Sequence, residues 1–330
     1  MSEKAKVSII VPLYNYEEYV EKAVRSLMQQ TYRNIEIIVV DDGSTDNSGM
    51  IADRLAKEDE RIKVVHQSNG GIGRALQTAQ KMITGDYVAF LDSDDYMEAD
   101  AYEELLKVAL ETNADIVEFG ITAYDTEGIC MGIELPSPSK IIGNSEVIND
   151  YFFHDKRPHL STKFVKSSLF MNLNIMPYSA AIDEMTTLQI LCYAEKIVKI
   201  NKSYYNVIRN KESVSRAIID GNKLREQISA YKTFGEYIEK KNKTISTYFA
   251  VDVAKKYSVM YYRNKTEGFG EKSDVHNIES EMISAFNTAY KSIDFQIARG
   301  HYSGLDLLAL GVFRIWPDLF CVLYRRVKHK

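Results

Sequence analysis

The sequence predicts an α/β fold, in which a mostly parallel sheet carries helices on both faces and a helical extension follows. Two observations lead to this prediction. Short apolar runs alternate with amphipathic stretches through the first hundred residues, and the pattern becomes helical from about Asn222 onward. Alternation with short loops is typical of parallel strands joined by helices. Right-handed crossovers then place the carboxyl ends of these strands at one edge of the sheet, where ligands of such folds bind.

Each apolar run and each amphipathic stretch defines an expected element. Strands are expected over Val7–Pro12, Ile35–Val40, Ile62–His66, Tyr87–Leu91 and Ile116–Thr122. Helices are expected over Glu17–Gln30, Met50–Glu58, Ile72–Ile83 and Tyr102–Glu111. Residues Gly128–Ile142, with two prolines, indicate a hairpin or a loop excursion. We expect a first domain over residues 1–218 and a helical region over 219–330.

Composition excludes several classes of protein. Hydrophobic residues make up 45% and charged residues 26% of the 330 residues, which excludes a disordered or fibrous chain. A net charge of −5 argues against a sequence-independent nucleic-acid binder. Three widely spaced cysteines indicate neither a disulfide framework nor a zinc site, as expected of a cytoplasmic protein. The first apolar run is too short for a signal peptide, and no run is long enough to span a membrane.

Three carboxylates follow one apolar strand directly: Asp92, Asp94 and Asp95, with Ser93 between them. Like charges at such short spacing raise each other's pKa unless a cation lies between them. Mg²⁺ typically takes one or two carboxylates and completes its shell with water and substrate phosphates. The turn therefore indicates a metal that bridges to a diphosphate, and the alternative is a helix N-cap.

Two other strand ends carry polar groups suited to a nucleotide. Asp41 follows the second strand and can accept a hydrogen bond from a bound base, although a solvated turn is the alternative. Tyr14 follows the first strand and offers a flat face for stacking. Residues 71–76 partly match the dinucleotide pattern G-x-G-x-x-G, with Leu76 in place of the third glycine, and Arg74 could reach a phosphate.

Taken together, four segments resemble family 2 glycosyltransferases in order and spacing. They are Val7–Asn15, Asp41–Asp46, Asn69–Gly71 and Phe90–Asp95. The resemblance covers about residues 6–98 strongly and about 160–216 more loosely. It implies a GT-A fold, a nucleotide-sugar donor, a divalent metal, and transfer with inversion at the anomeric carbon.

The resemblance also implies roles at the donor site. Pro12, Tyr14 and Glu17 would line the nucleoside pocket, with Tyr14 against the uracil of a UDP-sugar. Asp41 would bond the base.

Other matching residues would face the diphosphate. Asp92 and Ser93 would approach the ribose and diphosphate, and Asp94 would be the ligand of Mn²⁺ or Mg²⁺ in the D-x-D motif. Gly71 would allow close approach of the donor. The family's arginine after the glycines is displaced here, and Arg74 stands in its place or the contact is lost.

A catalytic base is expected where relatives carry an acidic pair, usually Glu-Asp. Here Ile182 precedes Asp183, and Glu184 follows it. We align Asp183 with the base and keep Glu184 as the alternative, and the start of a surface helix would also explain both acids. Three further segments match the family more loosely: Lys163–Phe170 at the acceptor cleft, and Tyr204-Tyr205 and Ser213–Ser215 at the end of the domain.

The carboxyl-terminal segment, residues 305–330, is rich in apolar and aromatic side chains and ends in Arg325-Arg326-Val327-Lys328-His329-Lys330. Such a segment can lie in the interface of an anionic membrane. The alternative is a helix that packs on the protein's own core or on a second subunit, which leaves a homo-oligomer open.

These observations predict a metal-dependent inverting glycosyltransferase. It would extend a cell-surface glycan or a lipid-linked acceptor, in the cytoplasm or at the inner face of the membrane, and would bind no nucleic acid. One alternative is a non-catalytic nucleotide-sugar-binding homologue, suggested by Ile182 and the displaced arginine. The other is an NAD-dependent oxidoreductase, which rests only on the partial glycine pattern.

Overall fold

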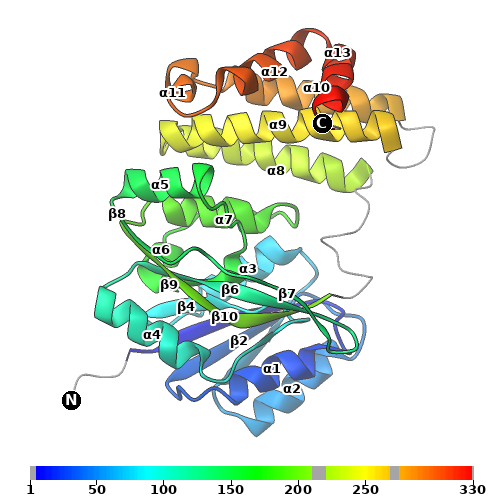
Figure 1. The fold of residues 1–330 in the computed structure, drawn as a ribbon. Coiled ribbons are helices and arrows are strands. Elements are labelled where there is room, and N and C mark those ends of the chain that lie inside the picture. The colour runs from blue at the N-terminus through cyan, green and yellow to red at the C-terminus, as the bar shows by residue number, and fades with distance from the viewer. Residues whose placement is uncertain (1–4, 210–220, 268–274, 329–330) are drawn as a thin grey trace. The chain divides into compact units, whose positions relative to one another are not determined.

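A computed structural model describes residues 5–209, 221–267 and 275–328 (Figure 1). The chain divides into two compact units, Met1–Arg216 and Ala217–Lys330. Each unit has its own core and is described separately below.

The first unit contains a mixed sheet. Its described strands run in the order β3-β2-β1-β4-β9-β6-β10-β5, with β7 beside β6 and β8 beside β10. Their bounds are β1 Val7–Leu13, β2 Ile35–Asp41, β3 Ile62–His66, β4 Tyr87–Phe90, β5 Tyr96–Met97, β6 Ile116–Asp125, β7 Cys130–Glu134, β8 Ser139–Ile142, β9 Lys163–Lys166 and β10 Lys196–Arg209. Strands β1 to β4 are parallel to one another, as expected, and so are β6 and β10. Strands β5, β7, β8 and β9 run antiparallel to their neighbours.

Helices cover both faces of this sheet (Figure 1). Helices α1 (Val20–Met28), α2 (Ser48–Glu58) and α4 (Ala101–Thr112) pack on one face and share one apolar core with β1 and β2. The other face carries α3 (Ile72–Gln80), α5 (Asn144–Phe153), α6 (Ser167–Met171) and α7 (Ile182–Leu191). Because β1 and β2 are covered on both sides, they are apolar at nearly every position.

Two details differ from the pattern-based expectation. Helix α1 begins at Val20 rather than Glu17, because hydrogen bonds to the loop after β2 hold the backbone of residues 15–17 in a turn. Residues Gly128–Ile142 do not form a hairpin: β7 pairs with β6, whereas β8 pairs with β10. Pro136 and Pro138 lie between the two strands and cannot donate a ladder hydrogen bond.

The second unit is helical in its described part, which confirms the expected extension. Its helices are α8 Gly221–Glu239, α9 Lys243–Glu267, α10 Val275–Lys291, α11 Phe295–Arg299, α12 Gly304–Ile315 and α13 Pro317–Lys328. Aromatic side chains from four of these helices form the core, among them Phe234, Phe249, Phe286 and Phe313. Within the described residues, no helix has the length and apolar character that crossing a membrane requires.

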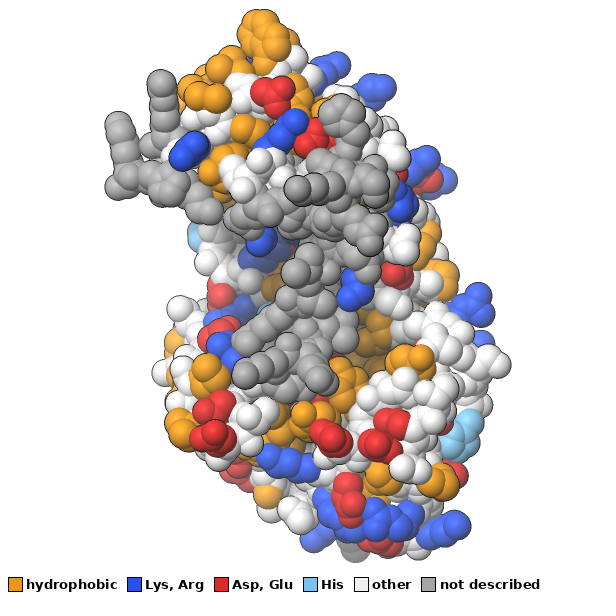
Figure 2. Space-filling view, turned by 90° about the vertical axis from the view of Figure 1, so that its right-hand side faces the viewer, with side chains coloured by type: hydrophobic (Ala, Val, Ile, Leu, Met, Phe, Trp, Pro, Cys, Tyr) orange, Lys and Arg blue, Asp and Glu red, His pale blue; other side chains and the backbone are white. Residues whose placement is uncertain are grey.

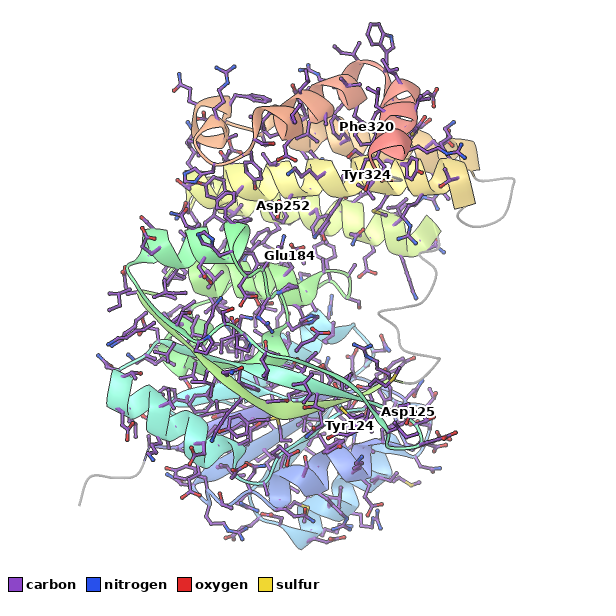
Figure 3. The ribbon with its side chains drawn as sticks, viewed as in Figure 1. Tyr124, Asp125, Glu184, Asp252, Phe320 and Tyr324 are labelled. Atoms are coloured by element: carbon purple, nitrogen blue, oxygen red, sulfur yellow. The ribbon has the colours of Figure 1, made fainter. Side chains whose placement is uncertain are left out.

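Helices α12 and α13 have two different sides. On one side Phe313 packs against Phe286 and Tyr261, while Phe320 packs against Phe313 and stacks on Tyr324 of the same helix (Figure 3). The other side exposes seven large apolar residues, which we call the α12–α13 apolar face: Leu305, Leu308, Ile315, Trp316, Leu319, Val322 and Leu323. Figure 2 shows hydrophobic side chains on this part of the surface, at the top of the view.

Candidate active site

The loops that follow β1 and β2 are tied together at the carboxyl edge of the sheet. The backbone amide of Asn15 donates to Ser44 Oγ, and Asn15 Oδ1 accepts from the amide of Thr45 at 2.8 Å. Glu17 Oε2 accepts from the backbone and side-chain nitrogens of Asn47. Glu17 therefore braces the second loop, while Tyr14 is 44% exposed beside it. Pro12 lies half-buried on β1.

Asp41 and Asp42 are both buried at the end of β2. Asp42 accepts hydrogen bonds from the backbone amides of Gly70 and Gly71, which fixes the glycine-rich loop after β3. Asp41 Oδ1 accepts from the amide of Ser44 at 3.0 Å, and Asp41 Oδ2 lies 2.8 Å from His66 Nδ1. Burial alone raises the pKa of Asp41, but the hydrogen bonds from Ser44 and His66 outweigh it and lower the pKa.

The glycines at the start of α3 face another part of the same chain. Gly71 has a φ of +83°, and a Cβ there would lie 2.3 Å from Ser179 Oγ. A Cβ on Gly73 would lie 2.1 Å from the carbonyl oxygen of Met176. The amide of Gly73 also donates to the carbonyl of Tyr178. The absence of a side chain at Gly73 therefore makes room for residues 176–179. The next residue, Arg74, is exposed and forms no ion pair within the described residues.

The turn after β4 brings three carboxylates near one another, of which Asp95 is buried while Asp92 and Asp94 are half-buried. Asp92 Oδ2 accepts from the hydroxyl of Tyr205 at 3.0 Å, and Asp95 Oδ1 accepts from the amide of Ile208. Burial, with the charges of Asp183 and Asp94, raises the pKa of Asp92 to about 7. Burial, with the charges of Asp92 and Asp94, raises the pKa of Asp95 to about 8. Ser93 is also buried in this turn.

Asp94 is the third carboxylate of this turn, and it is half-buried. Burial raises its pKa, and the nearby hydroxyl of Tyr16 acts in the opposite direction. Burial, followed by the charge of Asp94, in turn raises the pKa of Tyr16 to about 12. A neutral phenol therefore lies against this carboxylate at neutral pH.

The two acids at the start of α7 have different surroundings. Asp183 lies close enough to Asp92 for its charge to raise the pKa of that carboxyl. Burial raises the pKa of Asp183 itself, and the positive charges of His159 and Lys163 and the amide of Leu160 act in the opposite direction. Glu184 is buried and forms an ion pair with Lys156 Nζ at 2.9 Å. It lies on α7, as labelled in Figure 3.

The cluster suits a divalent cation held jointly with a substrate. In the described part of the chain, Asp92, Asp94 and Asp95 form no ion pair with Lys, Arg or His, so their repulsion is uncompensated. Three acidic, His or Cys side chains do not converge on one point anywhere in residues 5–209, 221–267 and 275–328. An all-protein cage is therefore absent from that part of the chain. One or two carboxylates plus phosphate oxygens match the usual coordination of Mg²⁺.

The chain matches the family model described as "Glycosyl transferase family 2" over residues 8–156. It is 32% identical to the glycosyltransferase GlyG of Streptococcus pneumoniae over 68% of this chain and 78% of GlyG. The chain belongs to glycosyl transferase family 2. It is also 32% identical to GlyA of the same organism, but there it spans only 36% of the relative's length.

A solved structure agrees with the GT-A fold. The crystal structure of Staphylococcus aureus TarS residues 1–349 in complex with UDP-GlcNAc superposes with a TM-score of 0.76 at 20% identity. The alignment covers 98% of this chain and 92% of that chain. Likeness at this identity shows the fold, which confirms the expected architecture. Membership of family 2 places the chain among the transferases and decides against the oxidoreductase alternative.

Of the segments that match the family more loosely, Lys163–Phe170 is described by the structure of this family 2 chain and Ser213–Ser215 is not. Lys163–Phe170 forms β9 and most of α6, and Phe164, Val165 and Phe170 are fully buried in the core. Lys163 is also buried, and its ammonium group donates to the carbonyls of Arg157 and His159. Ser213–Ser215 lies outside the described residues.

Two residues of the site were not predicted as site residues: Tyr16 and His66. Tyr16 and His66 follow or end a strand at the carboxyl edge, and that position was a usable signal. Lys163 and Tyr205 lay in segments that matched the family loosely, without a contact being assigned to either. They come from β9 and β10, whose side chains reach the site only through pairings between distant strands. No local pattern indicates those contacts.

Proposed function

We propose that this chain is a metal-dependent, inverting glycosyltransferase that moves a sugar from a UDP-sugar to a glycan or lipid-linked acceptor in cell-surface polysaccharide synthesis. One observation carries the proposal: Asp183 on α7 lies close enough to Asp92, in the turn after β4, for its charge to raise the pKa of Asp92. Asp41 lies at the same edge of the sheet. The proposed base, the proposed diphosphate-facing turn and the proposed nucleobase acceptor would thus be grouped together.

At the donor end, Asp41 would accept the N3–H of uracil, and the exposed ring of Tyr14 would stack on the base. Arg74 carries a guanidinium that no described side chain pairs, so it is available to a phosphate oxygen. The TarS structure with UDP-GlcNAc supports a uridine nucleotide as the first choice to test. Pro12 and Glu17 would shape the same pocket, with Glu17 acting through the Asn47 loop.

At the diphosphate, Asp94 would be the protein ligand of Mn²⁺ or Mg²⁺, with Asp92 and Ser93 nearby. A divalent cation bound there would stabilise the negative charge that develops on the leaving diphosphate. Asp92 would orient the donor, since Tyr205 holds its carboxylate in place. Gly71 would present backbone to the donor from the loop that Asp42 fixes.

For the base we propose Asp183 rather than Glu184. A sugar hydroxyl is a poor nucleophile at neutral pH, and a carboxylate within about 3 Å that takes its proton typically contributes 10²–10⁴ in rate. The ion pair with Lys156 occupies Glu184, whereas Asp183 shares its surroundings with Asp92. Attack on the face opposite the leaving group then inverts the anomeric carbon, with no covalent intermediate.

A thermal-shift titration with UDP and Mn²⁺, each alone and together, tests the donor site. We expect a shift that needs both, since a ligand at 100 times its dissociation constant adds about 2.7 kcal/mol. Asp94→Ala should remove the metal-dependent part. A shift with another nucleotide, and none with UDP, would contradict the donor assignment.

Turnover with a panel of UDP-sugars tests the base. Asp183→Asn should keep UDP binding and reduce transfer at least about 100-fold, whereas Glu184→Gln should keep most of the rate. The reverse result would move the base to Glu184. Binding of UDP-sugars without transfer to any acceptor extract would instead favour the non-catalytic homologue.

We further propose that the α12–α13 apolar face rests on an anionic membrane from the cytoplasmic side, close to lipid-linked acceptors. Seven exposed apolar residues, with Trp316 among them, are followed by a sequence rich in Arg and Lys, a combination that favours the interface of acidic lipids. Co-sedimentation with vesicles of phosphatidylglycerol and phosphatidylcholine tests this. Leu308→Ser with Leu323→Ser should abolish binding, and a concentration-dependent dimer that the same changes disrupt would indicate self-association instead.

A further inference from the structure

His66 links Asp41, the proposed base-recognition residue of β2, to helix α2. It is the last residue of β3, and the register of the two parallel strands places it directly beside Asp41. Its Nδ1 lies 2.8 Å from Asp41 Oδ2, and its Nε2 lies 3.1 Å from Asp53 Oδ1 on α2. One imidazole therefore joins two carboxylates from two different elements.

The neighbourhood leaves little freedom to Asp41, whereas the side chain of His66 is 49% exposed. A Cβ on Gly49, in the first turn of α2, would lie 2.7 Å from Asp41 Oδ2 and 3.3 Å from the His66 ring. Helix α2 thus packs closely against the pair. Asp41 is 4% exposed, so its carboxylate cannot swing into solvent.

The hydrogen-bond donors around Asp41 determine how many acceptor positions of its carboxylate remain for a ligand. A carboxylate offers about four acceptor positions. The amide of Ser44 uses one on Oδ1, and His66 uses one on Oδ2. The remaining acceptor positions are held in a fixed direction because both oxygens are already bonded.

We propose that His66 is a positioning residue that sets nucleobase selectivity through Asp41. It fixes the carboxylate so that one lone pair faces the base edge, where it accepts N3–H of uracil and repels the N3 lone pair of cytosine. Asp53 anchors the far side of the ring. This inference rests on the proposed uridine donor, since Asp41 has a base to select only if that donor binds.

A site that bonds a donor group rejects an analogue without it, because its buried acceptor is then left unpaired. Loss of the anchor should therefore change the ratio of the affinities for UDP and CDP. General loosening of the fold would weaken both nucleotides equally and leave this ratio unchanged.

The experiment is calorimetric titration of the full chain with UDP and with CDP, in the presence of Mn²⁺. We expect His66→Phe to reduce the selectivity for UDP about tenfold to hundredfold, the value of one charge-assisted hydrogen bond. His66→Asn, whose amide nitrogen can replace Nδ1, should retain most of it. His154→Phe, an exposed histidine after α5, is the matched control and should change nothing.

An unchanged UDP-to-CDP ratio in His66→Phe would overturn the inference, as would equal wild-type affinities for the two nucleotides. Should His66→Phe fail to fold, His66→Ala with and without added imidazole gives the same test, and the expected result is recovery of the ratio by imidazole. Absence of any wild-type binding to UDP would instead refute the proposed function.

Discussion

Replacing Asp92 by Asn should stabilise the metal-free protein at alkaline pH, although Asp92 belongs to the proposed donor site. The folded chain holds this carboxylate beside Asp94 and Asp183, and burial with their charges raises its pKa from 3.8 to about 7. The folded state therefore binds a proton that the unfolded state releases. Stability contributed by this group is lost as pH rises from about 4 to about 7.

The size of the effect follows from the pKa difference. One pK unit corresponds to about 1.36 kcal/mol. Between pH 5 and pH 7.5, wild type should lose about 2–3 kcal/mol relative to Asp92→Asn. Asparagine can still accept the hydrogen bond from Tyr205, so its own stability should change less with pH. For a unit of this size, this difference corresponds to roughly 4–12 °C in melting temperature.

Differential scanning calorimetry in EDTA at several pH values measures this difference. The second unit is an internal standard, because Asp92 belongs to the first unit and its replacement should leave the melting of the second unchanged. Asp100→Asn, at an exposed carboxylate, is the matched control. A melting difference that is the same at pH 5 and pH 7.5, or a less stable Asp92→Asn at pH 7.5, would refute the reasoning.

Three further predictions concern other contacts. Burial opposes the ionised form of Glu36, but hydrogen bonds from Lys63, Ser8 and Thr84 lower its pKa to about 2. Glu36→Gln should therefore reduce the free energy of unfolding by about 2–3 kcal/mol at pH 7. Urea unfolding should show that this loss shrinks as pH falls from about 4.5 toward 2. Gly73→Ala places a Cβ against the carbonyls of Met176 and Tyr178, and we expect a loss of about 1–3 kcal/mol. These residues lead into α7, which carries Asp183, so the transfer rate should fall more than the UDP affinity. An unchanged rate would show that residues 176–179 do not position Asp183. Phe313 is fully buried in the second unit, so Phe313→Ala should destabilise that unit by about 3–5 kcal/mol. Calorimetry should show its melting at lower temperature, while UDP binding by the first unit stays the same.

Local patterns were sufficient for β1 to β4, β6 and the helices α1 to α4, and for the edge at which polar residues gather. The apolar runs that form β1 to β4 are short and bounded by turns, and parallel connections place their ends together whatever the details of packing. Asp41, Asp92 and Asp94 can therefore be assigned to one edge from the sequence alone. Composition also marks residues 305–330 as an apolar segment, but it does not tell that the segment forms two helices, α12 and α13, or which of their residues face the core.

Contacts between distant segments could not be predicted in this way. The partner of Glu184 is Lys156, on a loop whose position depends on the packing of α5 and α7. The partners of Gly71 and Gly73 are residues 176–179, and no periodicity indicates a contact over a hundred residues of chain. Strands β7 and β8 pair with different neighbours, β6 and β10, and no local pattern distinguishes this arrangement from a hairpin.

The close approach of α3 to residues 176–179 constrains how such an enzyme can be re-engineered. Because backbone atoms of Met176 and Tyr178 fill the space that a side chain at position 73 would need, a transplanted segment must follow the same backbone path. Strands β7 and β8 carry almost entirely exposed side chains, and the close backbone approach there involves only the end of β7, where a Cβ on Gly120 would lie 2.5 Å from the carbonyl oxygen of Glu134. Variation that must preserve the fold is therefore better tolerated at the exposed side chains of 130–133 and 139–142 than at 176–179.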